Sequence, residues 1–121
     1  MPDLKTKAES ILSTTTGVDM KTAASPTLYT VPTGKTARVT GLIVRDTSAS
    51  LAGGTSYSVT NWRQTFSLAN LTTSGTGYIH VFGADLAQYT ETAAGVAITF
   101  TVTTGATSAG TATIDLLGYL S

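Results

Sequence analysis

The sequence contains no cysteine, a single histidine and few charged residues. Without cysteine, disulfide bonds and thiolate metal sites are excluded. The one histidine, His80, cannot supply a zinc site of two histidines within one chain. Because Ile79 and Val81 flank it in an apolar run, we expect His80 to be a structural strand residue rather than a catalytic one.

Charge is scarce and balanced. Charged residues make up 12% of the chain, against a usual share of about 25%, and seven basic residues balance seven acidic ones. Nucleic acids and anionic membranes both select for a basic excess. No run approaches the ~20 apolar residues of a membrane span, and no signal-peptide core follows Met1. We therefore expect no nucleic-acid partner, no membrane partner and synthesis in the cytoplasm.

The motifs of common active sites are missing as well. There is no Gly-x-Ser-x-Gly elbow and no Asp-x-Asp-x-Asp-Gly calcium loop. Gly53-Gly54 lacks the Gly-Lys-Ser/Thr of a phosphate-binding loop. The seven acidic residues show no spacing that predicts a carboxylate pair for glycoside hydrolysis. The sequence thus predicts a protein that is not an enzyme, with no catalytic residue, metal ligand or cofactor.

What the sequence does contain is the two-residue period of β-strands. Apolar and polar residues alternate from Val96 to Val102, then again from Thr111 to Leu116, around a break rich in Gly and Ser. Two such runs around a flexible turn predict a β-hairpin that closes the domain. In the first run, Val96 and Phe100 are expected to point inward.

Further β-prone runs precede this pair at intervals typical of a sandwich or barrel. Residues Pro32 to Lys35 are predicted to form a turn. The phase of the alternation changes at Gly41, which predicts a β-bulge or a bend there. A strand that is buried on both faces near its end is the alternative. The prediction is an all-β, antiparallel, jelly-roll-like sandwich of about seven or eight strands, and an immunoglobulin-like strand order remains open. The expected strands cover 27–31, 35–45, 56–59, 64–68, 78–82 and the final pair.

The N-terminal part reads differently. Residues 1–24 are predicted to form an arm or short helix with a linker, and residues 25–121 the sandwich. A helix would carry Leu4, Ile11 and Leu12 on one face, capped by Asp3. The alternatives are a flexible tail, an arm that docks on a neighbouring subunit, or a weak first strand after Gly17.

The end of the chain breaks the half-buried pattern. Beyond Asp115, Leu117 and Tyr119 point outward while Leu116 and Leu120 point inward, so both faces are apolar. The run from Tyr78 to Phe82 shows the same two-sided pattern. A second subunit could bury the apolar outer face, so the sequence predicts a homo-oligomer, with a trimer as the leading arrangement. Long loops over that face are the alternative.

Trp62-Arg63 is the one conspicuous aromatic–arginine pair. It fits a core position, a protein interface or a sugar-stacking site. The candidate interface residues are Leu117, Tyr119, Leu120, Tyr78, Phe82, Trp62, Arg63, Leu4, Ile11 and Leu12.

Three segments carry a family resemblance: Tyr29–Lys35 (Tyr-Thr-Val-Pro-Thr-Gly-Lys), the strand Ala37–Val44, and the terminal run Thr113–Leu120. They resemble small β-sandwich structural proteins of tailed bacteriophages, including capsid decoration (cement) proteins and tail or fibre modules. The resemblance implies a virion protein on the capsid surface, without enzymatic activity, whose partners are further copies of itself and the major capsid protein. The alternative that it implies is a tail- or fibre-associated adhesin that binds a host surface receptor through its loops.

Overall fold

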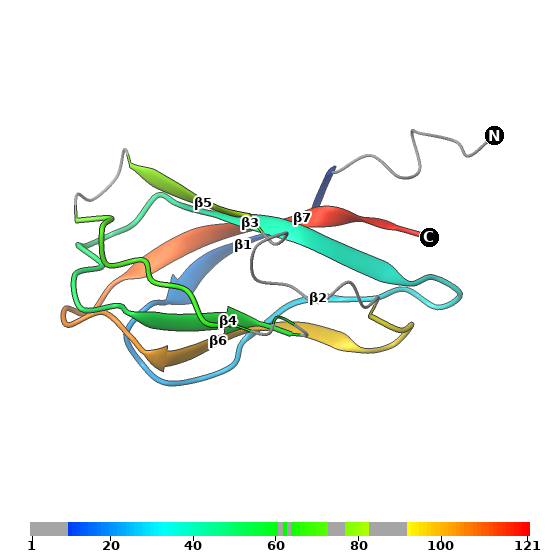
Figure 1. Ribbon diagram of the computed structural model, residues 1–121, viewed down its shortest axis with the longest axis horizontal. Coiled ribbons are helices and arrows are strands. Elements are labelled where there is room, and N and C mark those ends of the chain that lie inside the picture. The colour runs from blue at the N-terminus through cyan, green and yellow to red at the C-terminus, as the bar shows by residue number, and fades with distance from the viewer. Residues whose placement is uncertain (1–9, 61, 63, 73–76, 83–91) are drawn as a thin grey trace.

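The computed structural model describes residues 10–60, 62, 64–72, 77–82 and 92–121 (Figure 1). These residues form seven β-strands, and none of them is helical. The strands are β1 (Ser10–Asp19), β2 (Thr27–Thr30), β3 (Ala37–Arg45), β4 (Ser56–Val59), β5 (Tyr78–Phe82), β6 (Ala97–Thr104) and β7 (Thr111–Leu120).

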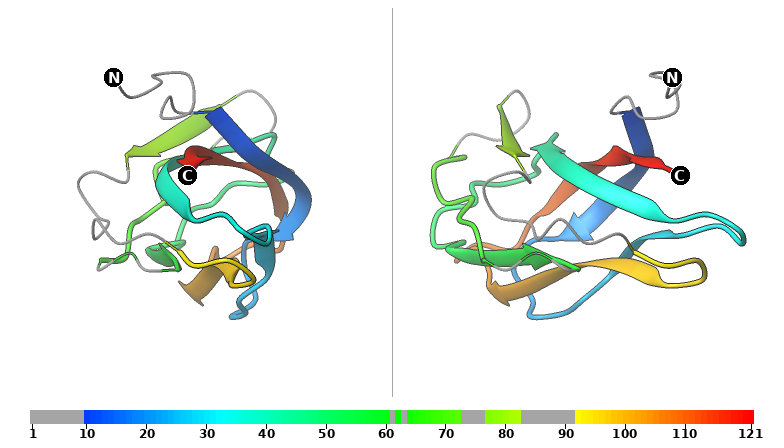
Figure 2. Two further views of the ribbon diagram at one scale, coloured as in Figure 1. Left: turned by 90° about the vertical axis from the view of Figure 1, so that its right-hand side faces the viewer. Right: turned by 45° about the vertical axis from the view of Figure 1, so that its right-hand side comes forward.

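Two antiparallel sheets pack face to face (Figures 1 and 2). One has the strand order β1-β7-β3-β5 and the other β2-β6-β4. The pairs are nested, β1 with β7, β2 with β6 and β3 with β5, as in an antiparallel ribbon that has been rolled up into a jelly roll. An immunoglobulin-like sandwich would place the first two strands side by side in one sheet. The jelly-roll-like prediction is therefore confirmed, and the strand order decides against the immunoglobulin-like alternative.

The expected strand over 64–68 is reduced to a single bridge between Phe66 and Tyr57 on β4. Phe66 still exchanges both backbone hydrogen bonds with Tyr57, at 2.8 and 2.9 Å. This bridge lies beside β4, where an eighth strand would complete the three-stranded sheet.

The predicted terminal hairpin is wrong. β6 and β7 lie in different sheets and do not pair. The connection between them is held by the chain that follows β1: Ala106 N–H donates to the Met20 carbonyl at 2.9 Å, and Met20 N–H donates to the Gly110 carbonyl at 3.0 Å. A Cβ on Gly105 would lie 2.2 Å from the Lys21 carbonyl oxygen, so this close approach requires glycine. These contacts carry the connection from one sheet to the other.

The predicted irregularity in the longest strand is confirmed. The register of β3 against β7 shifts between Val39 and Gly41, which leaves Thr40 as the extra residue of a β-bulge. The bulge restores the phase, because Ala37 and Val39 before it and Leu42 after it all contact the core. Without the extra residue, one of these two groups would point to solvent.

The core lies between the two sheets. Tyr57, Phe66 and Phe100 form an aromatic cluster with ring centroids 5.4 to 6.3 Å apart. The Tyr57 hydroxyl donates to the Met20 carbonyl at 2.9 Å, and burial raises the pKa of this phenol. The inward positions of β6 are buried as predicted, but Val96 precedes the strand and is 43% exposed.

Residues 10–19 correct the expectation for the N-terminal part. They form β1, which pairs with β7 along its length, so Ile11 and Leu12 belong to a strand and not to a helical face. The sandwich therefore includes residues that the sequence predicts to be arm and linker. Period alone does not reveal this strand, because two register shifts break its alternation, one between Ile11 and Ser13 and the other between Thr15 and Val18.

Candidate functional site: the outer face of the four-stranded sheet

The outer face of the four-stranded sheet holds most of the candidate residues. Directly opposite residues of paired strands point to the same side of a sheet, so the register defines rows across it. Ile11, Leu117 and Gly41 occupy the first row; Thr14, Asp115, Ile43 and His80 the second; Thr113, Arg45 and Tyr78 the third. We call these rows the outer face.

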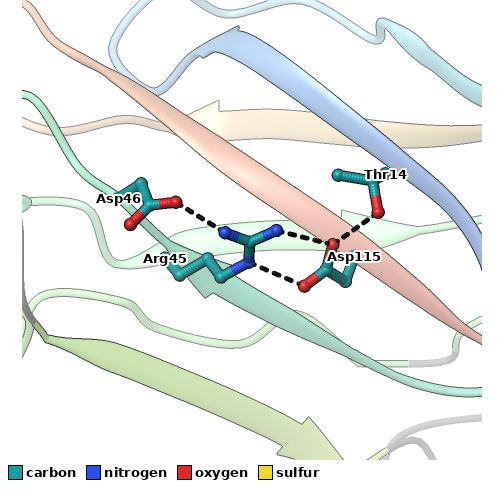
Figure 3. A network of polar contacts seen from close by, with 4 residues as sticks. All are labelled: Thr14, Arg45, Asp46 and Asp115. Carbon is teal, nitrogen blue, oxygen red and sulfur yellow. Dashed lines mark hydrogen bonds and ion pairs between the residues drawn. The ribbon is translucent and has the colours of Figure 1, made fainter.

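A polar network crosses the middle of the outer face (Figure 3). Arg45 Nε donates to Asp115 Oδ2 at 2.8 Å, and Arg45 Nη2 donates to Asp115 Oδ1 at 3.3 Å. Thr14 Oγ1 donates to Asp115 Oδ1 at 2.7 Å, and Arg45 Nη1 pairs with Asp46 Oδ2 at 2.6 Å. Strands β1, β7 and β3 are thus joined by side chains as well as by their backbones.

The network carries one negative charge in excess, since one guanidinium faces two carboxylates. The Asp115 side chain is 6% exposed and that of Arg45 is 40% exposed. The hydrogen bond from Arg45 lowers the pKa of the Asp115 carboxyl below its usual range, and the hydrogen bond from Thr14 adds to this effect. Asp115 therefore stays ionised and paired at neutral pH.

Leu117 is covered within one chain. The sequence predicts that a second subunit or a long loop covers it; β7 is an interior strand of the sheet and Leu117 is only 5% exposed in the single chain, so no second subunit is needed to bury it. Its flanking strands place Ile11 opposite it on one side and Gly41 on the other. The two-sided apolar end of the chain thus lies on an interior strand and is buried without a second copy. The end of β7 therefore no longer argues for a second subunit, and the oligomeric state stays a prediction.

The large apolar side chains exposed on the outer face lie at its two edges. Ile11 on β1 is 59% exposed and Tyr78 on β5 is 68% exposed. Among the remaining candidates, Leu12 and Leu120 are partly buried against the core, and Tyr119 is half-buried. Ile11 and Tyr78 are therefore the predicted interface residues that one chain leaves open to a partner.

Trp62 is a core residue. Its side chain is buried, and its ring lies 5.7 Å from that of Phe66, centroid to centroid. The sequence leaves open a core position, a protein interface or a sugar-stacking site for Trp62, and in the structure it lies in the core. Arg63, Leu4 and the side chain of Phe82 lie outside the described part of the chain.

Sequence reasoning missed the network around Asp115, because it treated this residue as one surface acid among several. A signal was present: a carboxylate between Ile114 and Leu116 in an apolar strand requires a cationic partner. The identity of that partner depends on the pairing of β7 with β3, which the sequence does not reveal.

In the part of the chain that the structure describes, no three His, Asp or Glu side chains gather as metal ligands do. None of the described residues forms a helix with the length and hydropathy that a membrane crossing requires. Comparisons of the chain with protein-family models, with curated proteins and with solved structures find no match.

Proposed function

We propose that this protein is a non-enzymatic virion protein of a tailed bacteriophage, of the capsid decoration type, which binds the head lattice and stabilises it. The observation that carries the proposal is the outer face, where Ile11 and Tyr78 are exposed around a charge network that is already paired. Each of these side chains provides apolar area whose burial by a partner is favourable, by about 25 cal/mol per Å². The resemblance of Tyr29–Lys35 and of the terminal strand to phage β-sandwich proteins supplies the virion context.

The mechanism follows from the low charge of this face. Burial of apolar and neutral polar surface provides a small affinity per copy, and many copies on one lattice add these contacts together. Because Arg45 and Asp115 already pair with each other, docking over them does not leave either of these two charges buried and unpaired. The alternative is a tail- or fibre-associated adhesin that binds a host surface receptor through its loops; burial of Trp62 removes only the sugar-stacking role considered for that residue.

The test uses expanded empty heads of the phage that encodes the chain, stripped of this protein. Added protein is expected to sediment with the heads at a saturable stoichiometry and to raise their melting temperature in differential scanning calorimetry. Bovine serum albumin at the same concentration serves as the control for non-specific adsorption. Failure to co-sediment at tens of micromolar, or an unchanged melting temperature at saturation, would refute the proposal.

A further inference from the structure

Strand β5 differs from the other three edges of the sandwich. Among the described residues, the edge strands are β1 and β5 in one sheet and β2 and β4 in the other, and the Phe66 bridge lies beside β4. The pairings of β1, β2 and β4 all contain register shifts, whereas β5 pairs with β3 over five consecutive residues without one. Bulges and charges are the devices that keep an edge from pairing with another chain. β5 has neither, since its sequence is Tyr-Ile-His-Val-Phe.

The same five residues are self-complementary. The sequence of β5 is nearly symmetric about His80: an aliphatic residue on each side, then an aromatic residue on each side. In an antiparallel pair centred on His80, position 78 of one copy faces position 82 of the other, and position 79 faces position 81. Aromatic residues then face aromatic residues, and aliphatic residues face aliphatic ones. These are the cross-strand pairs that stabilise sheets.

We infer that β5 pairs with β5 of a second copy of this chain, antiparallel and centred on His80. The pairing joins two four-stranded sheets into one continuous sheet of eight strands across a twofold axis. A twofold interface requires a patch that is complementary to itself, and the symmetry of β5 about His80 meets that requirement. Figures 1 and 2 show β5 at the rim of the sandwich, on the side of the four-stranded sheet opposite β1.

The geometry of this dimer extends the outer face. A twofold axis perpendicular to the joined sheet keeps the outer faces of both copies on the same side. Tyr78, which is 68% exposed in one chain, is then partly covered by the second copy. The inference does not depend on the virion proposal, because sedimentation of the purified protein tests it without capsids.

The absence of cysteine permits a direct test of the register. Opposite residues in an antiparallel pair have Cα atoms about 4.5–5.5 Å apart, within the range that a disulfide spans. The His80→Cys variant is expected to form a covalent dimer under mild oxidation, judged on a non-reducing gel. Tyr78→Cys should not cross-link with itself but should cross-link with Phe82→Cys when the two are mixed. A Ser58→Cys variant on the edge strand β4 is the matched control and should remain monomeric on the gel.

A charge swap provides an independent measurement. His80→Asp places two carboxylates opposite each other and is expected to weaken dimerisation about 100-fold in sedimentation equilibrium. His80→Lys should do the same, while a mixture of the two variants should form a heterodimer, because opposite charges then face each other. Thr30→Asp on the edge strand β2 should leave the dimer unchanged. The inference is overturned if the wild type is monomeric at 100 µM, or if His80→Cys cross-links no faster than Ser58→Cys.

Discussion

Replacing Leu117 by Ala tests whether the outer side of β7 is covered within one chain. Leu117 is 5% exposed, and substitution of a buried Leu by Ala destabilises proteins by about 2–5 kcal/mol. Because Leu117 lies on the outer face and outside the core cluster between the sheets, we expect the lower half, about 2–3 kcal/mol. For a chain of this length that corresponds to a fall in melting temperature of about 8–12 °C.

Urea unfolding of the dilute protein provides the assay, with the fluorescence of Trp62, the single tryptophan, as the probe. With an m-value of about 2 kcal/mol per molar urea, the midpoint should fall by about 1 M or slightly more. Ile11→Ala is the matched control, because Ile11 lies opposite Leu117 but is 59% exposed, and it should change stability by no more than about 0.5 kcal/mol. If the two variants unfolded alike, and Leu117→Ala changed only the sedimentation of the protein, a second subunit and not the chain itself would cover Leu117.

Three further predictions concern the fold. Pairing lowers the folded pKa of Asp115, so its stabilisation is complete above the unfolded pKa of about 3.9 and is lost as the pH falls through the lower folded value. The urea midpoint of the wild type should thus approach that of Asp115→Asn as the pH falls below about 4, and a constant difference would contradict the pairing. Tyr57→Phe removes the hydrogen bond to the Met20 carbonyl and should lower the free energy of unfolding by about 1–2 kcal/mol in urea titrations. Gly118→Ala brings a Cβ to 2.1 Å from the Arg38 carbonyl oxygen, so soluble expression and melting temperature should both fall; an unchanged melting temperature would exclude this contact.

The strands with a clear period of two could be predicted from the sequence. Runs such as Ala37–Arg45 and Tyr78–Phe82 form strands at the expected places, and the change of phase at Gly41 marks a bulge. These features are local, because alternation reports which face of a strand is buried and an extra residue shifts the phase. The positive φ of Gly34, in the turn after Pro32, is also a local feature that the sequence predicts.

The partners of these strands could not be predicted. The alternation of apolar and polar residues looks the same whether β6 pairs with β7 or lies across the core from it. The sequence therefore predicts a terminal hairpin that the structure does not contain. The burial of Leu117 within one chain could not be predicted for the same reason, because the place of β7 inside the sheet is set by pairing. Asp115 and Arg45 meet only because β7 lies beside β3.

Binding of the Ile11→Asp variant to expanded heads tests the role of the outer face most directly. Ile11 lies on β1, at the opposite edge of the sheet from β5, so the substitution leaves the proposed dimer edge intact. Val96→Asp is the control, since Val96 is also exposed but precedes β6 in the other sheet. The outer-face account predicts that Ile11→Asp lowers the affinity for heads by about tenfold or more while Val96→Asp binds as the wild type does. Equal binding by all three proteins, with unchanged folding, would contradict it.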